Sequence, residues 1–406
     1  MIRHVLRHLP FGLASQVLAS GTNFLILVAL ARTQSADDFG WSALSVAAVT
    51  ALVGVSRSVF GTPIALAAGS DTALRAEGRF GASAAVLASC VAALPVGTWA
   101  AWNGRWEVLA ICAAAPVLVL HDVLRQICFS SGTPRMAFAS DLVRVAAAAG
   151  VVAITAVAQV PAWAIVGSWA LSAAVAATYL GVALRWSFMH QGIRRYWLLT
   201  SRTRRALFGE SALVQVAPIV TSTIIGAAIA PVALSGFRGG STLLGPVSIL
   251  LTAVPLLVLP RLVREGTQTM ADSLARLRPI SAALSVFCLA IAAAALVIPD
   301  AAGEVVLGRS WAATSDVLPI MAAQFALQPW ALAVTTSLRL VGRAGLLLRL
   351  RLATTLTVVS VVAIVSTTGS VVWVVVAILA VDVVSTTAYL VVGHRLRHQR
   401  AHTQTS

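Results

Sequence analysis

The chain has 406 residues, of which 59% are hydrophobic and only 11% charged, and its mean hydropathy is +0.90. Soluble domains carry roughly 25% charged residues, so this composition excludes a soluble globular protein and indicates a polytopic membrane protein. All 29 basic residues are arginines, and they exceed the 14 acidic residues to give a formal net charge of +15. We attribute the excess to the arginines that orient membrane proteins rather than to a nucleic-acid partner, which we do not expect.

Twelve apolar runs follow one another along the chain. About 20 residues, rising 1.5 Å each, cross the hydrocarbon of a bilayer, and each run is long enough to do so. Arg3 and Arg7 precede the first run as in a signal peptide, but the run is too long for one, so we expect it to stay as the first span. The predicted spans are residues 10–31, 41–63, 80–101, 107–128, 138–159, 163–184, 206–229, 238–260, 279–299, 313–336, 350–368 and 372–393.

The links between these spans are alternately rich and poor in arginine. One set carries most of the arginines, including the run from Arg194 to Arg205, whereas the other set carries only Arg32, Arg105, Arg238 and Arg309, at most one in each link. Arginine accumulates in cytoplasmic links. The first set, and both termini with it, is therefore predicted to face the cytoplasm of a bacterium whose plasma membrane holds the chain.

The longest polar segment, residues 185–205, divides the chain nearly in half. It predicts a basic surface helix that rests on anionic membrane lipids. Phe208 and Gly209 open the seventh span much as Phe11 and Gly12 open the first, and two similar six-span bundles are a common transporter plan. The predicted parts are an N-terminal six-helix bundle (1–184), a basic cytoplasmic linker (185–205), a C-terminal six-helix bundle (206–393) and a cytoplasmic tail (394–406).

Three stretches resemble one family of membrane transporters. They are LARTQSADDFGWSAL between the first two spans, GFRGGSTLLGPVSILLTAVPLLVLPRLV at 236–263, and VVLGRSWAATSDVLPIMA at 305–322. All three are similar to the polysaccharide-exporter branch of the multidrug/oligosaccharidyl-lipid/polysaccharide exporter (MOP) superfamily. The resemblance implies an all-α integral membrane fold of about twelve transmembrane helices, in two pseudo-symmetric six-helix bundles around a central cavity. It also implies a flippase for polyprenyl-pyrophosphate-linked sugars that works by alternating access.

Arginines within the spans are the first candidates for substrate binding. Arg57 lies inside the second span, where its planar guanidinium is suited to pyrophosphate oxygens; the alternative is that it reaches the nearby headgroups. Asp122 with Arg125, and Asp141 with Arg144, are three residues apart and so share a helical face. Each pair is expected either to form an intrahelical ion pair or to place its arginine at the cytoplasmic mouth, with the carboxylate as an exchangeable counter-ion.

Acidic residues are the candidates for coupling transport to a proton or sodium gradient. Asp382 lies about ten residues inside the last span, where an acid is by default a functional hypothesis; the alternative is a structural hydrogen bond to a neighbour such as Ser385. Glu210 opens the seventh span, where it also suits the helix dipole. Asp141 is the third candidate.

Uncharged amides within the spans are candidates for binding the sugar. Hydrogen bonds between helices explain each of them equally well. Gln324 and Gln328 are four residues apart, which predicts that they share one helical face. The amides are Gln16, Asn23, Gln324 and Gln328.

The sequence contains no enzyme signature: there is no Walker loop, HExxH or GxSxG motif, and every external link is short. The cysteines lack CxxC spacing, so we expect neither a metal nor a cofactor. The leading prediction is a flippase or exporter for a lipid-linked oligosaccharide or polysaccharide precursor, working with glycan polymerase machinery. The alternatives are a cation-coupled multidrug exporter, which a cavity rich in arginine disfavours, a peptidoglycan-precursor flippase, and a membrane-embedded glycan-assembly enzyme or scaffold.

Overall fold

The computed structural model describes residues 2–34, 36–189, 193–229, 231–267, 269–307 and 311–397. Within these ranges the chain consists of helices and their connections, and twelve helical segments are long and apolar enough to cross a membrane. The predicted all-α fold with twelve spans is thereby confirmed. The chain forms two compact units, Met1–Arg204 with Leu256–Glu265 (unit 1) and Arg205–Pro255 with Gly266–Ser406 (unit 2).

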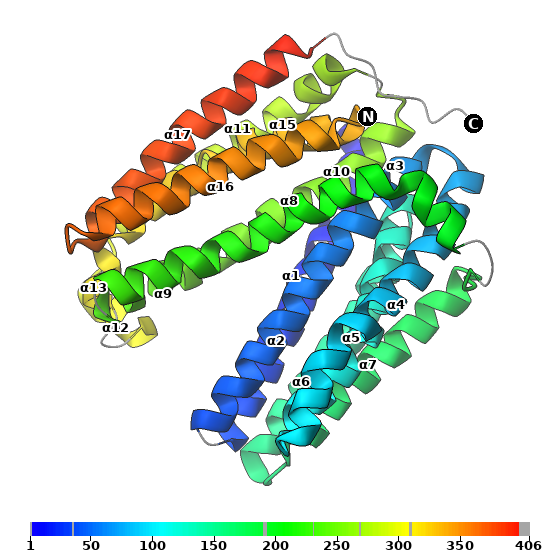
Figure 1. The fold of residues 1–406 in the computed structure, drawn as a ribbon, viewed down its shortest axis with the longest axis horizontal. Helices are drawn as coiled ribbons and strands as arrows, with labels where there is room; N and C mark the ends of the chain where they lie inside the picture. The colour runs from blue at the N-terminus through cyan, green and yellow to red at the C-terminus, as the bar shows by residue number, and fades with distance from the viewer. Residues whose placement is uncertain are drawn as a thin grey trace. The chain divides into compact units, whose positions relative to one another are not determined.

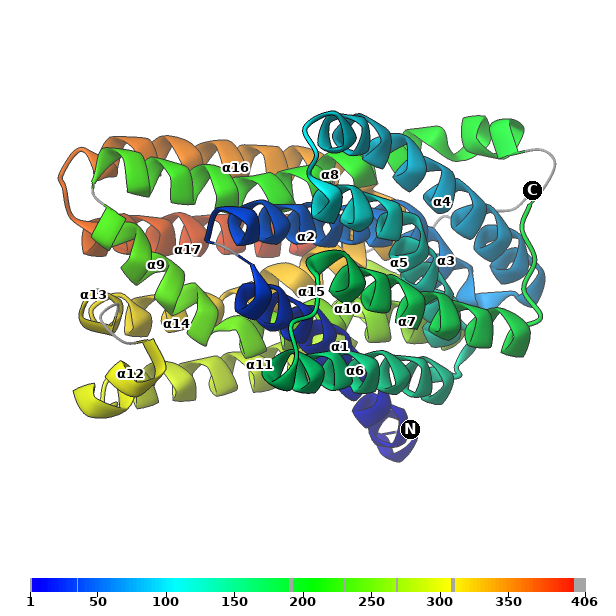
Figure 2. The same cartoon turned by 90° about the horizontal axis from the view of Figure 1, so that it is seen from below.

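Unit 1 is built from the first six spans. Helix α4 packs along α5, α1 packs along α6, and α5 also contacts α7 (Figures 1 and 2). Ile26, Leu30, Ile111, Ile165 and Trp169 are almost fully buried where these helices meet. The elements are α1 (Ile2–Thr33), α2 (Ala36–Ser56), η1 (Arg57–Gly61), α3 (Thr62–Leu66), η2 (Ala67–Gly69), α4 (Asp71–Trp102), α5 (Trp106–Ser131), α6 (Pro134–Val157) and α7 (Ala162–Ala183).

The second span is not a regular α-helix. After α2 the chain widens into one π-helical turn, η1, returns to α-helix in α3, and tightens into the 3₁₀ turn η2. Pro63 is the second residue of α3, and it has no backbone N–H to donate to the preceding turn. Single π-helical turns within α-helices are frequent at functional sites, and this one begins at Arg57.

Unit 2 holds the other helices, except for Leu256–Glu265, which belong to unit 1. Helix α11 packs against α14 and α15, and α16 runs beside α17 (Figure 1). The elements are α8 (Ile193–Ala228), whose first turns belong to unit 1, and α9 (Pro231–Leu243), α10 (Gly245–Arg264), α11 (Met270–Ala295), α12 (Asp300–Leu307), α13 (Trp311–Ser315), α14 (Leu318–Phe325), α15 (Gln328–Leu340), α16 (Ala344–Ser366) and α17 (Val371–Arg395).

Two of the predicted spans are interrupted. The span predicted at 238–260 is divided at Leu244, between α9 and α10, and the span predicted at 313–336 is divided into α13, α14 and α15. Gln324 belongs to α14 and Gln328 begins α15, with Ala326 and Leu327 between them in right-handed helical backbone, so the shared face of the two amides stays a prediction. Pro329, which lacks the N–H that a continuous helix would need, follows directly.

Helix α8 is continuous over 36 residues. It joins the basic residues 193–204, predicted as a surface helix, to the seventh span. The division of the chain at 185–205 stays a prediction, and the predicted tail lies outside the described residues after Arg397.

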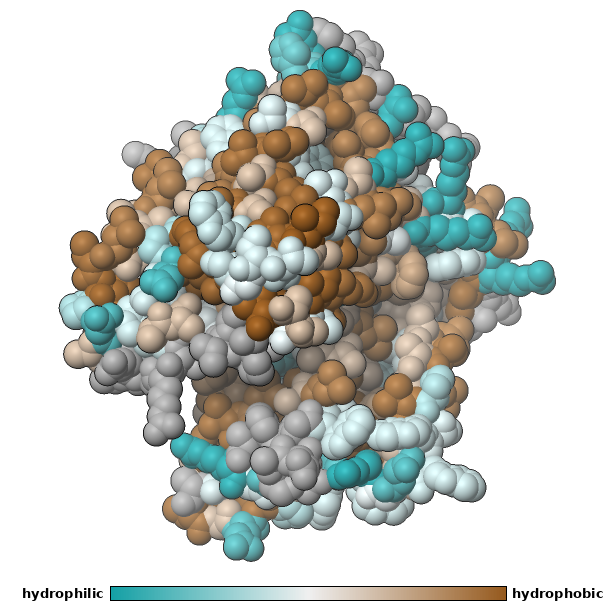
Figure 3. All heavy atoms as spheres, turned by 60° about the vertical axis from the view of Figure 1, so that its left-hand side comes forward, coloured by the Kyte–Doolittle hydropathy of each residue, from teal (hydrophilic) through white to brown (hydrophobic). Residues whose placement is uncertain are grey.

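Large apolar side chains are widely exposed on the helices. Phe24, Leu171, Leu199, Val286 and Val384 are examples, and each is more than half exposed. Figure 3 shows hydrophobic side chains over much of one face, with hydrophilic ones mainly at its margins. Such extended apolar surface needs lipid rather than water around it, so the chain is a multi-pass membrane protein.

Gly236 tests the packing of α9 against α13. A Cβ atom at this position would lie 2.4 Å from the backbone oxygen of Ala313, and a backbone atom cannot move aside as a side chain can. We expect Gly236→Ala to lower the free energy of unfolding by about 1–3 kcal/mol, measured by thermal unfolding in detergent. Gly345→Ala is the control, since nothing lies within 4 Å of its added Cβ. Equal melting temperatures for the two variants would contradict the packing described.

Candidate functional site

A buried carboxylate in unit 1 binds two guanidinium groups. Arg57 donates from Nε to Asp122 Oδ2 over 2.8 Å and from Nη2 to Oδ1 over 2.6 Å, a bidentate pair. Arg125, one turn along α5, donates from Nη1 to the same Oδ1 over 3.0 Å. Asp122 therefore joins η1 to α5, and the predicted pairing of Asp122 with Arg125 is confirmed.

Arg125 extends this cluster to two further helices. Its Nε lies 2.9 Å from Asp141 Oδ2 on α6, and its Nη2 donates to Ser15 Oγ on α1 over 3.0 Å. The Ser15 hydroxyl in turn donates to Asp141 Oδ2. One guanidinium thus bridges two aspartates and a serine from α1, α5 and α6.

Arg144 binds an imidazole rather than a carboxylate. Its Nη1 lies 3.2 Å from His121 Nδ1, and His121 Nε2 lies 3.1 Å from Ser140 Oγ, whose own proton goes to the Ala137 carbonyl. Because a guanidinium can only donate, Nδ1 must accept, and the pattern assigns the neutral Nε2–H form of His121. The predicted intrahelical pair of Asp141 and Arg144 is wrong, since Asp141 faces Arg125 across the interface of α5 and α6.

These charges are held away from solvent. Asp141 and His121 are fully buried and Arg125 is 1% exposed, whereas 29% of the Arg57 side chain is exposed. Buried charges are stable only when paired and hydrogen-bonded. Three guanidinium groups against two carboxylates leave the cluster with a formal charge of +1. Asp141 Oδ1 and Arg144 Nε make no hydrogen bond to the described residues. This end of the cluster therefore has one acceptor and one donor available to bind a ligand.

The two amides predicted on α1 lie differently. Gln16 is buried next to Ser15, and its Oε1 has no partner among the described residues. Asn23 is half-buried about two turns further along. Only Gln16 therefore neighbours the cluster in sequence and in burial.

A second buried network ties the start of α8 to α4. Arg204 donates from Nη2 to Glu77 Oε2 over 2.6 Å, and Tyr196 donates to the other oxygen, Oε1, over 2.8 Å. The Arg204 guanidinium lies 4.6 Å from the ring centre of Phe80 and 5.8 Å from that of Phe60, within the range of cation–π attraction. Arg204 is 1% exposed, so it is a core residue and not one of the lipid-facing arginines expected at 185–205.

Arg204 also supplies a hydrogen bond that Pro63 cannot make. In a regular α-helix the carbonyl of residue 59 accepts from the N–H of residue 63, and residue 63 is a proline. Arg204 Nη1 instead donates to the Val59 carbonyl over 2.7 Å. The turn that carries Arg57 is thus anchored from outside by the start of α8.

In unit 2, Glu210 lies between two arginines. Arg339 Nη2 on α15 donates to Oε2 over 2.9 Å, and Arg351 Nη2 on α16 lies 3.8 Å from Oε1. Glu210, one of the predicted ion-coupling acids, therefore joins α8 to α15 and α16.

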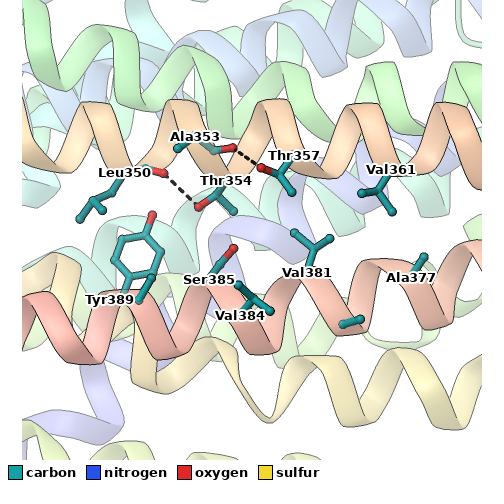
Figure 4. A pocket seen from close by; sticks show the side chains of 12 residues that line it. Leu350, Ala353, Thr354, Thr357, Val361, Ala377, Val381, Val384, Ser385 and Tyr389 are labelled. Carbon is teal, nitrogen blue, oxygen red and sulfur yellow. Dashed lines mark hydrogen bonds between the residues drawn. The ribbon is translucent and has the colours of Figure 1, made fainter.

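The hydrogen-bond partner of Asp382 is Gln324, not Ser385. Gln324 Nε2 on α14 donates to Asp382 Oδ2 over 2.7 Å. The predicted structural hydrogen bond of Asp382 therefore exists, but its partner is Gln324 and the prediction of Ser385 is wrong. Ser385 and Tyr389 instead point toward α16, into an apolar groove of about 410 Å³ between α16 and α17 (Figure 4). Gln328, the other predicted amide, is half-buried at the start of α15.

Several residues of these networks could not be predicted from the sequence. Glu77 and Arg204 are 127 positions apart, and nothing local links them. Arg339 and Arg351 lie at the edges of their predicted spans, 313–336 and 350–368, and more than 120 positions from Glu210, so nothing local linked them to it. Among the described residues, no three His, Cys, Asp or Glu side chains gather into a possible metal site.

No family model matches the sequence, and neither does any curated protein. Solved structures nevertheless share its architecture over nearly the whole chain, and they are membrane transporters. The chain therefore has a transporter fold, and the fold is that of the MATE family of the MOP superfamily.

Three of these solved structures show how similar their folds are to the fold of this chain. A multidrug resistance MATE family transporter of the MOP superfamily, outward-facing, has a TM-score of 0.72 at 12% identity over 96% of this chain and 94% of its own. The Vibrio cholerae MATE transporter VcmN gives 0.71 at 12%, over 97% and 96%. A MOP superfamily transporter from Pyrococcus furiosus gives 0.65 at 13%, over 96% and 94%. The predicted superfamily fold is confirmed, while these neighbours do not specify the polysaccharide-exporter branch.

The pair of Glu77 and Arg204 gives a test of the second network. Glu77→Gln or Arg204→Met alone leaves one buried charge unpaired, so each should lower the free energy of unfolding by about 3–5 kcal/mol. The double variant should lose about 1–3 kcal/mol less than the sum of the two. Thermal unfolding in detergent measures all three. Glu77→Gln combined with Arg343→Gln, an exposed arginine outside the network, should be additive, and additivity in the Glu77–Arg204 pair itself would contradict the assignment.

Proposed function

We propose that this chain is an ion-coupled secondary exporter of amphipathic organic cations in a bacterial plasma membrane, with both termini in the cytoplasm. One observation carries the proposal: a buried cluster of five charged side chains lies where α1, η1, α5 and α6 meet. The fold supports it, since the outward-facing neighbour is described as a multidrug resistance transporter. Alternating access between two units is the transport mechanism that such folds serve.

Asp141 is the acid best placed to couple transport to an ion. Asp122 is held by two guanidinium groups, whereas Asp141 has one, from Arg125, and keeps one oxygen without a hydrogen bond. A proton or sodium ion on Asp141 would weaken its attraction for Arg125 and for Ser15. The junction of α1, α5 and α6 then has two arrangements that ion binding can bias.

The acids of unit 2 are supporting candidates. Glu210 lies between Arg339 and Arg351, so a free cation there would compete with two fixed ones. Asp382 accepts a hydrogen bond from the neutral amide of Gln324. A change in its ionisation would therefore alter fewer charged contacts than the same change at Asp141, which lies against Arg125. We therefore assign the primary coupling role to Asp141.

The charge of the unit 1 cluster bears on the substrate. The sequence predicts a cavity with unpaired arginines, and such a cavity would repel a cationic substrate. Arg57 and Arg125 are paired with aspartates, which removes most of that objection. The report on the Pyrococcus furiosus protein likewise relates a different function to a binding pocket of reverse polarity, so pocket charge is the property to test.

A lipid-linked oligosaccharide or polysaccharide precursor remains the second candidate substrate. Arg144 has no carboxylate partner, and Arg57 is the most exposed of the three arginines. Under this alternative Arg57, Arg125 and Arg144 would bind the pyrophosphate, and glycan polymerase machinery would act next.

Transport in proteoliposomes decides between the two substrates. Purified protein is reconstituted into vesicles with an acidic or a sodium-loaded lumen, and accumulation of the cationic dye ethidium is followed. In a parallel assay, movement of a polyprenyl-pyrophosphate-linked oligosaccharide between leaflets is measured. Gradient-driven dye accumulation supports the cation exporter. Movement of the lipid-linked sugar without dye transport would replace it with the second candidate.

The same vesicles test the role of Asp141. We expect Asp141→Asn to reduce gradient-driven accumulation at least about 10-fold, because a neutral amide cannot exchange the coupling ion. Asp272→Asn is the matched control, since Asp272 is an exposed acid bound to Thr269 at the start of α11. Full gradient-driven transport by Asp141→Asn would contradict the assignment.

A further inference from the structure

A second pocket of unit 2 is lined by residues that take no part in the networks described above. It has a volume of about 650 Å³ and is formed by the beginning of α11, part of α15 and the end of α17, which pack together. Its lining residues are Ala271, Leu274, Ala275, Arg278, Trp330, Ala333, Thr387, Leu390, Val391, Gly393, His394, Arg395 and Arg397.

The charged side chains of this pocket are all basic. Arg278 from α11 and Arg395 from the last turn of α17 are exposed, and neither forms an ion pair with a described residue. Arg397 joins them from beyond α17, where its carbonyl accepts from the Ala271 N–H over 3.0 Å. The nearest acid in sequence, Asp272, is not part of the lining and binds the Thr269 hydroxyl. The pocket therefore attracts anions.

The rest of the lining is apolar. Leu274, Ala333, Leu390 and Val391 contribute aliphatic surface, and Trp330 adds a broad aromatic side chain with a polar edge. An inorganic anion would use the arginines and leave this surface unused. The combination matches a ligand with an anionic head and a hydrocarbon tail.

The position along the helices fits a membrane lipid. Arg395 is the last residue of the final span, and the pocket residues of α11 come from the first third of its span. Helix ends lie at the level of the lipid headgroups, where tryptophan and arginine are favoured. Basic pockets between transmembrane helices are suited to anionic lipid headgroups.

We propose that this pocket is a binding site for an anionic phospholipid, whose phosphate contacts Arg278 and Arg395 and whose acyl chain lies against Leu274 and Leu390. The pocket lining includes none of residues 185–205, where the sequence predicts contact with anionic lipids. It does not depend on which substrate the protein exports.

The test uses the full-length protein, delipidated in detergent, with phosphatidylglycerol as the probe. Phosphatidylglycerol should raise the melting temperature in a saturable way, because a ligand of the folded state stabilises it. Phosphatidylcholine and inorganic phosphate at the same concentrations should not. We expect Arg278→Gln/Arg395→Gln to weaken phosphatidylglycerol binding about 30-fold.

Arg343→Gln/Arg349→Gln is the matched control. It removes the same charge from two exposed arginines that do not line the pocket, and it should change the affinity less than about 3-fold. Equal losses in the two double variants, or equal stabilisation by phosphatidylcholine or by inorganic phosphate, would overturn the proposal. If the pocket variant does not fold, Arg395→Gln alone should weaken binding about 5-fold, and unchanged binding in that single variant would equally overturn it.

Discussion

Asp122 is the residue on which the arrangement of unit 1 depends. A lone charge in the interior of a membrane protein is costly. The Asp122 carboxylate compensates the charge of two guanidinium groups, those of Arg57 and Arg125. Through Arg125 the same chain of contacts reaches Asp141 and Ser15. Four elements are therefore held at one place by charge compensation, and none of these side chains can change state without affecting the others.

The second constraint is the anchoring of the π-helical turn η1. Its first residue, Arg57, is bound to α5, while its third residue, Val59, accepts a hydrogen bond from Arg204 at the start of α8. Pro63 makes this possible, because its missing N–H leaves the Val59 carbonyl available. Glu77 and Phe80 in turn hold Arg204. Two buried networks thus meet within five residues of one span, which places η1 where the ion cluster and the first turns of α8 influence each other.

Hydropathy and helical spacing predict those features that depend on residues close in sequence. The twelve spans follow from local composition, and the pair of Asp122 and Arg125 follows from their spacing on one helix. Spacing fails where a partner on another helix competes, as when Asp141 binds Arg125 rather than Arg144. It also fails for Glu210, whose partners Arg339 and Arg351 lie on other helices. The breaks in the eighth and tenth spans were missed because apolar composition continues through them.

The same limit applies to function. The motifs predict the superfamily fold, which the solved structures confirm at 12–13% identity. They do not determine the charge of a binding site, because that charge depends on pairing. Arg57 looks unpaired from its apolar neighbours in sequence, and only the folded chain brings Asp122, 65 positions away, into contact with it.

The wide turn η1 has a consequence for the length of the second span. Each residue of an α-helix rotates the chain by about 100°. A π-helical turn accommodates one extra residue, so it changes the direction in which the side chains of α2 point relative to those of α3. Removing one residue from this stretch would let it close into a regular helix and would swing α2 by about that angle. Val46 and Val49 would leave the core, and Trp41 and Leu44 would turn from the outside. The count of residues here is thus as tightly fixed as their identity, and a single deletion would be more damaging than most substitutions.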